Sequence, residues 1–145
     1  MKSKIILLVE DNPSDIDLTK RAFEKQHIMN ELIVAMDGKE ALDFLFGEGN
    51  YLNRDVSVQP ALILLDLNLP VIDGLEVLRQ IRSNEKTRRL PVVVLTSSRE
   101  EQDLATSYDL GVNSYIRKPV DFTQFSEAIR QLGLYWLVIN EPPPL

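Results

Sequence analysis

The chain has no cysteine among its 145 residues, which excludes disulfide bonds and thiolate metal sites. Long apolar runs are missing as well. The run from Ile5 to Val9 is too short for a signal peptide. The longest run, near the C-terminus, is shorter than the ~20 residues that span a bilayer. We therefore expect a soluble cytoplasmic protein that does not contact a membrane.

Basic residues are in the minority, with 16 Lys and Arg against 22 Asp and Glu and a net charge of −6. This balance argues against nucleic-acid binding, which needs a basic surface, and it is compatible with binding a divalent cation. The length fits one domain with a substantial core. We expect that domain at residues 1–140, followed by a proline-rich tail at 141–145.

Short β-rich apolar runs alternate with helical segments, which predicts an α/β domain built on an open parallel sheet. Ser98 and Glu101 match a capping box for a helix ending at Gly111, and Asp121 with Gln124 caps the last helix. The polar connection at 47–60 is long for a compact domain, and such connections are often functional or mobile. Strands are expected at 5–9, 32–35, 62–65, 92–95 and about 114–117. The first helix is expected at about 14–26, the second after Asp37-Gly38 and ending at about Phe46, and the third at about 74–83.

The last helix is expected to be extended and carries an apolar seam with spacings of three and four residues: Phe122, Phe125, Ile129, Leu132, Trp136 and Ile139. Beyond Leu132 the surface is apolar nearly all round. One side can pack on the sheet, and large apolar patches that stay exposed usually bind a partner. We expect a homodimer with an interface that includes Phe122, Tyr135, Trp136 and Leu137. The alternative is that this end folds back over its own core.

Polar side chains follow the apolar runs where strands are expected to end. Glu10 and Asp11 follow the first strand, Asp66 follows the third, Thr96 ends the fourth, and Lys118 follows the fifth. Ligands bind outside the carboxyl ends of the strands in such sheets. We therefore expect these groups to converge on one pocket.

Such a pocket suits a carboxylate that accepts a phosphoryl group. Mg²⁺ prefers oxygen ligands, and Asp11 and Asp66 suit direct coordination, with the backbone carbonyl of Asn68 as a third ligand. Glu10 could hold a metal-bound water. Transfer to a carboxylate depends mostly on positioning and electrostatics, which this set supplies.

The Thr96 hydroxyl and the Lys118 ammonium can each donate to a phosphoryl oxygen. Taken singly, these residues have ordinary explanations: Asp66 as a helix cap, Lys118 as a surface charge and Tyr115 as half-buried packing. Together, at the ends of several strands, they indicate a phosphorylation site. His27 is the only histidine and is expected at the surface, so the phosphoryl group should come from another protein.

A family resemblance is carried by five segments: Glu10-Asp11, Leu64–Pro70, Asp73-Gly74, Leu95–Ser97 and Tyr115–Pro119. Through them the chain resembles the receiver domain of two-component response regulators, over roughly residues 3 to 131. The resemblance implies a flavodoxin-like (βα)5 doubly wound sheet with strand order 2-1-3-4-5. It implies that Asp66 is the phosphoacceptor and that Thr96 and Tyr115 form a switch pair. In the family the bond before Pro119 is typically cis.

The same comparison assigns Asp11 and Asp66 to Mg²⁺, with Glu10 in support, and makes Lys118 the phosphoryl contact. In the family, phosphorylation draws the residue at Thr96 toward the phosphoryl group and turns the aromatic residue at Tyr115 inward. The face formed by the fourth helix, fifth strand and fifth helix is thereby remodelled. Ser98, two positions after Thr96, bears on the lifetime of the phosphorylated state, which the sequence leaves open.

A narrower likeness is to the small stand-alone response regulators of bacterial, especially cyanobacterial, phytochromes. It rests on the glycine-containing loop after Phe46 and the terminal segment Tyr135-Trp136-Leu137. This likeness implies a phytochrome histidine kinase as phosphoryl donor and a dimeric regulator. Only residues 140–145 follow the expected last helix, so we expect no output domain.

Alternatives to this interpretation remain at the sequence level. The donor could be a non-phytochrome two-component or phosphorelay kinase. An aspartyl-phosphate phosphatase also uses a nucleophilic Asp, but generally with a second Asp two residues later, where this chain has Asn68. A scaffold with a vestigial site is the third possibility. We expect no enzyme beyond slow self-phosphorylation from small donors and autodephosphorylation.

Overall fold

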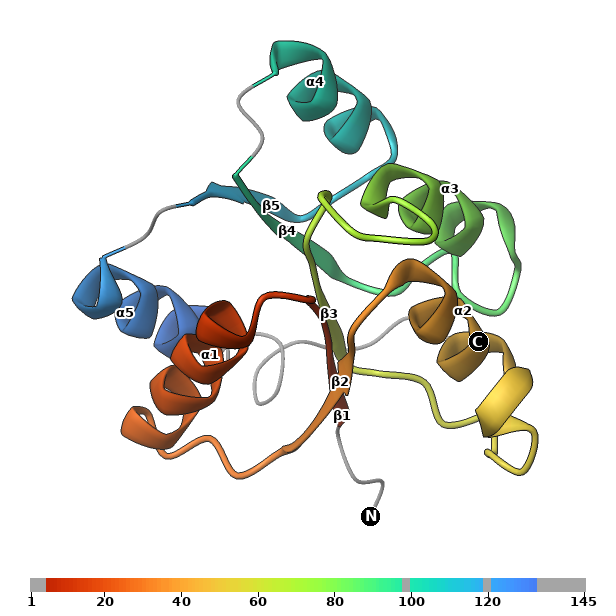
Figure 1. Cartoon of the computed structure of the whole chain (residues 1–145), viewed down its shortest axis with the longest axis horizontal. Coiled ribbons are helices and arrows are strands. Elements are labelled where there is room, and N and C mark those ends of the chain that lie inside the picture. The colour runs from red at the N-terminus through yellow and green to blue at the C-terminus, as the bar shows by residue number, and fades with distance from the viewer. Residues whose placement is uncertain (1–4, 98–99, 119–120, 133–145) are drawn as a thin grey trace.

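The computed structural model describes residues 5–97, 100–118 and 121–132, and these form a five-stranded parallel sheet with helices on both faces (Figure 1). The strand order is β2-β1-β3-β4-β5, which confirms the predicted flavodoxin-like topology. The strands are β1 (Ile5–Val9), β2 (Glu31–Ala35), β3 (Leu62–Leu65), β4 (Val92–Thr96) and β5 (Ser114–Arg117). The helices are α1 (Pro13–Lys25), α2 (Gly38–Phe46), α3 (Gly74–Ser83), α4 (Glu101–Asp109) and α5 (Phe122–Leu132), with a 3-10 turn η1 (Gly49–Tyr51).

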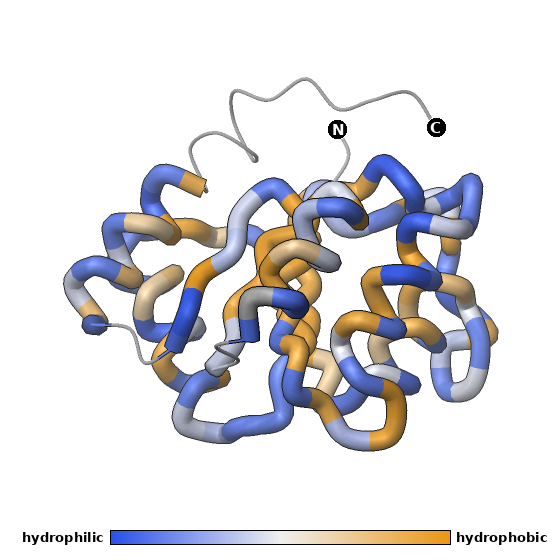
Figure 2. Tube along the Cα trace, turned by 90° about the horizontal axis from the view of Figure 1, so that it is seen from above, coloured by the Kyte–Doolittle hydropathy of each residue, from blue (hydrophilic) through white to orange (hydrophobic). Residues whose placement is uncertain are grey.

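The central strands are apolar on both sides because helices cover both faces of the sheet (Figure 2). Alternate residues of each strand point to opposite faces. In β1, Ile6 and Leu8 pack with Phe23 of α1 and Phe125 of α5, whereas Leu7 and Val9 pack against α2 and α3. The sheet therefore separates two cores, one under α1 and α5 and the other under α2, α3 and the end of α4.

The strand order reverses between β1 and β3. Strand β2 lies along one edge of β1, and the later strands are added along its other edge, starting with β3. In open α/β sheets a crevice forms at such a point, outside the carboxyl ends of the two strands. The register sets Val9 beside Leu65, so the next residues of the two strands, Glu10 and Asp66, are also brought side by side.

Helix α4 begins differently from the sequence prediction. Its N-cap is Glu100, which forms no side-chain capping bond, and Glu101 is the first helical residue. A capping box would need Glu101 at the third helical position, so that prediction was wrong. The helix ends at Asp109, and Gly111 follows with a φ of 76° in the left-handed region.

Helix α5 begins as predicted, because the Asp121 carboxylate accepts a hydrogen bond of 3.1 Å from the Gln124 amide. Phe125 and Ile129 of the apolar seam are buried. Leu134, Tyr135, Trp136, Leu137 and the proline-rich tail lie outside the described residues, so the expected extension and dimer contact stay predictions. Among the helices that the structure describes, none has the length and apolarity needed to cross a bilayer.

The connection at 47–60 is fastened to α2 by one arginine and one glutamine. The Arg54 guanidinium stacks 4.0 Å from the centre of the Phe44 ring and donates to the carbonyl of Val58. Gln59 donates to the carbonyl of Leu45 over 3.0 Å. These contacts give the long connection a defined course along α2, which its polar composition did not predict.

Candidate functional site

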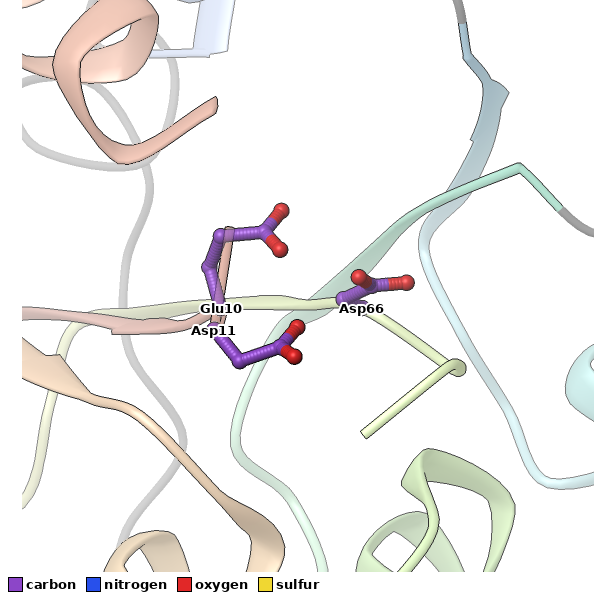
Figure 3. A group of neighbouring side chains, drawn as sticks. All are labelled: Glu10, Asp11 and Asp66. Carbon is purple, nitrogen blue, oxygen red and sulfur yellow. The ribbon is translucent and has the colours of Figure 1, made fainter. Parts of the chain in front are cut away.

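Three carboxylates meet at the carboxyl ends of β1 and β3. Glu10 and Asp66 are buried, with 1% and 5% of their surface exposed, and Asp11 is partly buried. One oxygen from each of the three residues lies within 4.8 Å of the others. Figure 3 shows Glu10 and Asp11 leaving the end of β1 in opposite directions and both turning their carboxylates toward Asp66. The structure thus brings together the acidic residues that the sequence placed at one pocket.

Lys118 brings a positive charge into this acidic cluster from the end of β5. Its Nζ lies 2.6 Å from Glu10 Oε1, 2.8 Å from Asp15 Oδ2 and 3.4 Å from Asp66 Oδ2. Burial alone would lower the pKa of Lys118, but hydrogen bonds to Asp15 and Glu10 outweigh burial and raise the pKa above its ordinary value. The side chain is therefore a cation, and its charge falls short of balancing the carboxylates around it.

The surroundings of the Glu10 carboxyl disfavour its charged form, chiefly because the group is buried. Burial raises the pKa of the Glu10 carboxyl to about 7, although the hydrogen bond from Lys118 acts in the opposite direction. The second Glu10 oxygen accepts a bond of 3.2 Å from the backbone amide of Asn12. A site that holds more carboxylates than cations and has clustered oxygens fits a divalent cation. Glu10, Asp11 and Asp66 are the side chains that could hold one.

Asp15 is a site residue that sequence reasoning missed. It lies in the first turn of α1, where the Asn12 side chain caps the helix by accepting hydrogen bonds from the amides of Ser14 and Asp15. Glu10 and Asp66 follow Leu8 and Leu64 by two positions, so their side chains face the α1 and α5 side of the sheet. The signal available in the sequence was an acid in the first turn of a helix that starts directly at a strand end.

Asn68, whose backbone carbonyl is the predicted third Mg²⁺ ligand, also forms hydrogen bonds through its backbone amide and its side chain. Its backbone amide donates to Asp66 Oδ1 over 3.0 Å. Its side-chain amide donates to the hydroxyls of Thr96 and Ser97, over 3.2 Å and 2.9 Å. Thr96 is buried at the end of β4, and its hydroxyl accepts the bond from Asn68.

A strained turn follows the buried carboxylate. Val71 has a φ of 70°, and the amide of Ile72 bonds to the carbonyl of Pro70 over 2.9 Å, which is the pattern of a γ-turn with positive φ. The loop closes at Gly74, where an added Cβ would lie 2.3 Å from the Asp66 carbonyl oxygen. These constraints fix the path of the chain directly after Asp66.

Tyr115 and Phe122 lie away from the carboxylates. Tyr115 is half-buried in β5, beside Val94, and packs on the core under α2 and α3. Phe122 is partly buried, and the side chains of Arg21 and Lys25 lie 5.5 Å and 5.3 Å from its ring centre. The predicted roles of Tyr115 in switching and of Phe122 in a dimer stay predictions. Ser98 and Pro119 lie outside the described residues.

Comparison with known proteins gives a consistent result. The protein-family model described as response regulator receiver domain matches residues 6–130. Response regulator Rcp1 of Synechocystis sp. is 43% identical over 92% of this chain and 89% of its own length. A probable methanogenesis regulatory protein, FilR2 of Methanothrix harundinacea, is 44% identical over 96% of this chain and 87% of its own length.

Solved structures with this fold include several phytochrome response regulators. A phosphorylated cyanobacterial phytochrome response regulator, RcpA, has a TM-score of 0.87 and 42% identity, covering 99% of this chain and all of its own. The Mn²⁺-bound form of response regulator Rcp1 has a TM-score of 0.85 and 41% identity, covering 97% and 99%. The bacteriophytochrome response regulator RtBRR has a TM-score of 0.81 and 54% identity, covering 99% and 86%.

Proposed function

Because the chain belongs to the family of response regulator receiver domains, we propose that it accepts a phosphoryl group on Asp66 from a sensor histidine kinase. The observation that carries this proposal is the setting of Asp66 itself. Its carboxylate is buried at the carboxyl end of β3, among two further carboxylates and an ammonium group. This setting brings a nucleophile, cation ligands and a phosphoryl contact together at one end of the sheet.

In the proposed reaction, an Asp66 carboxylate oxygen attacks the phosphorus of a phosphohistidine on the kinase. A P–O bond forms while the P–N bond breaks, and the electron pair of the broken bond returns to the imidazole nitrogen. The residues around Asp66 position the carboxylate and offset the charge of the phosphoryl oxygens. Lys118 and Thr96 are the donors to those oxygens, and the turn closed at Gly74 holds Asp66 in place.

Mg²⁺ is the cofactor that we propose for this site. Asp11 and Asp66 would bind it directly with the backbone carbonyl of Asn68, and Glu10 would hold a metal-bound water. When bound, the cation would neutralise charge on the carboxylates and on the incoming phosphoryl oxygens. The three clustered carboxylates support this assignment, and so does the related Rcp1, a Mn²⁺-bound form of which has been solved.

We propose that Thr96 and Tyr115 carry the signal from Asp66 to the face formed by α4, β5 and α5. A phosphoryl group adds negative charge and acceptor oxygens beside Thr96. The bond from the Asn68 side chain to the Thr96 hydroxyl links Thr96 to the segment that directly follows Asp66. On phosphorylation the Thr96 hydroxyl would turn to donate to a phosphoryl oxygen, and this movement would change the space available to Tyr115 on the neighbouring strand β5.

For the partner, we propose a histidine kinase of the phytochrome type. The similarity to phytochrome response regulators over nearly the whole chain supports this choice. FilR2 is as similar in sequence and is named a probable methanogenesis regulatory protein, so the alternative of a non-phytochrome kinase has support too. Transfer rates from a purified phytochrome kinase and from an unrelated kinase decide between them. Faster transfer from the phytochrome kinase is expected, and equal rates would remove the partner assignment.

The phosphoacceptor is tested by labelling with a small phosphoryl donor, acetyl phosphate, in the presence of Mg²⁺. The wild-type protein should gain the mass of one phosphoryl group, and Asp66→Asn should not. Asp17→Asn is a matched control, because Asp17 is an exposed carboxylate on α1 that pairs with Arg21. Labelling that survives in Asp66→Asn would overturn the assignment.

An aspartyl-phosphate phosphatase is the competing function. Such an enzyme generally has a second Asp two residues after the nucleophile, whereas this chain has Asn68 there, whose side-chain amide donates hydrogen bonds to Thr96 and Ser97. Receiver domains are signalling domains, so we expect label transfer to Asp66 without multiple turnover of phosphate esters. Sustained release of phosphate from such esters would favour the enzyme.

A further inference from the structure

The ammonium group of Lys118 is shared unequally among three carboxylates. Its contacts to Glu10 Oε1 and Asp15 Oδ2 measure 2.6 Å and 2.8 Å, whereas its contact to Asp66 Oδ2 measures 3.4 Å. An ammonium group has three protons to donate. The carboxylate proposed to react therefore receives the longest of the three bonds.

Asp15 reaches Lys118 from a well-anchored position. The Asn12 cap fixes the first turn of α1, and the Asp15 carbonyl accepts a bond of 2.8 Å from the Thr19 hydroxyl. Lys118 is held in turn at the end of β5, where its amide donates to the carbonyl of Thr96 over 2.7 Å. The ion pair thus ties the start of α1 to the end of β5.

We propose that Asp15 is a positioning residue that holds the Lys118 ammonium away from Asp66 before phosphoryl transfer and releases it to the phosphoryl group afterwards. This inference rests on the proposed phosphorylation of Asp66 and names a further residue for that reaction. Asp15 does not touch the reacting atoms. It acts through Lys118.

The physical reason lies in what a short ion pair does to a nucleophile. A carboxylate that accepts a short charge-assisted hydrogen bond has less negative charge available for attack on phosphorus. Because Lys118 directs its shorter bonds to Glu10 and Asp15, Asp66 is a better nucleophile than it would be with a short bond to Lys118.

Exposure indicates which of the two shorter bonds is given up after transfer. The Glu10 side chain is 1% exposed and the Asp15 side chain is 27% exposed. Water can therefore replace Lys118 at Asp15 more readily than at Glu10, because a buried carboxylate left without a partner is costly. On phosphorylation, the tie between α1 and β5 loosens.

The experiment measures the initial rate of Asp66 phosphorylation by acetyl phosphate at saturating Mg²⁺ in the full chain. Asp15→Asn should phosphorylate about tenfold more slowly, which corresponds to about 1.4 kcal/mol, since Lys118 then pairs with Asp66. Asp17→Asn removes the same charge from the same helix without touching Lys118, and its rate should match wild type. Asp15→Glu restores the acceptor and should recover most of the rate.

A double-mutant cycle separates positioning from structural support. In a Lys118→Met background, Asp15→Asn should change the rate by less than about twofold, because the group on which Asp15 acts is gone. An equal loss in both backgrounds would overturn the proposal, and so would a faster rate for Asp15→Asn in the wild-type background.

If Asp15→Asn does not fold, the carboxyl-carbon NMR signal of Asp15 in the wild-type protein gives the test instead. That signal should move on addition of beryllofluoride, a phosphoryl mimic, while the signal of Asp17 stays in place. No movement of the Asp15 signal in a protein that binds beryllofluoride would overturn the proposal.

The result also separates this inference from the proposed function. If wild type and Asp15→Asn are labelled on Asp66 at equal rates, the phosphoacceptor stands and the role of Asp15 falls. If wild type takes no label on Asp66, the proposed function fails and the role of Asp15 falls with it.

Discussion

Replacing Asp11 with asparagine should raise the free energy of unfolding of the Mg²⁺-free protein. Asp11 contributes one of three carboxylate oxygens that lie within 4.8 Å of one another. The ion pairs of Lys118 are with Glu10, Asp15 and Asp66 rather than with Asp11. Asp11→Asn keeps the size and shape of the side chain while removing one of the crowded negative charges.

The magnitude follows from Coulomb's law. Two unit charges at 4.8 Å repel each other by about 3.5 kcal/mol at an effective dielectric constant of about 20. Asp11 is partly exposed to water, and the Lys118 charge offsets part of the field of Glu10 and Asp66. We therefore expect Asp11→Asn to stabilise the Mg²⁺-free protein by about 1–2 kcal/mol after these discounts.

Urea unfolding followed by circular dichroism, with a chelator and again with Mg²⁺, measures the effect. Wild type should gain about 2.7 kcal/mol at a Mg²⁺ concentration 100 times the dissociation constant, and Asp11→Asn should lose most of that gain. Asp17→Asn is the control. Its exposed pair with Arg21 measures 3.1 Å, and its removal should change stability by at most about 0.5 kcal/mol.

Two results would refute the reasoning. Destabilisation of Asp11→Asn in the chelator would mean that Asp11 makes favourable contacts that outweigh the repulsion. An undiminished gain from Mg²⁺ in the variant would mean that the cation does not use Asp11. The first result would remove the argument from repulsion, and the second would require a different ligand set for the site.

Three further predictions concern the loop after Asp66 and the last helix. Val71→Gly should stabilise the protein by about 0.5–1 kcal/mol in urea unfolding, because Val71 is 74% exposed and has a φ of 70°, which is costly for a β-branched residue. A loss of stability would show that the turn holds Val71 without strain. Gly74→Ala should cost about 1–3 kcal/mol and slow labelling of Asp66, because its Cβ would lie 2.3 Å from the Asp66 carbonyl oxygen. Labelling at the wild-type rate would show that the loop can shift without moving the carboxylate. Trp136→Glu should give a monomer by light scattering while Asp66 is still labelled, since it places a charge in the apolar seam. An unchanged molecular mass would reject that seam as the interface.

The positions of the strands followed from local composition. The runs at 5–9, 62–65 and 92–96 are buried on both faces, so their apolar residues are continuous and short, which marks them as strands of a parallel sheet. The capping box at Ser98 and Glu101 failed although its residue types were right. Such a motif offers one way to start a helix, and the rest of the structure selects the residue at which α4 begins.

The convergence of Glu10, Asp66 and Lys118 could also be predicted, because the carboxyl ends of parallel strands share one edge of the sheet. The partner of Lys118 on α1 could not be predicted in this way. Asp15 and Lys118 are 103 residues apart in sequence, and an acid in the first turn of a helix is common in its own right. Likewise, the Asn68 side chain meets Thr96 across 28 residues of sequence.

The sequence by itself determined the strands, their parallel arrangement, and the kind of chemistry at their carboxyl ends, because these depend on composition and on short spacings. Only the tertiary structure decided how the charges are paired: which carboxylates share the single ammonium, how long each contact is, and how much water reaches it. Ion pairing depends on distance and burial, which are set when the sheet and α1 pack together. Asp15 therefore became visible as a partner of Lys118 only in the folded chain.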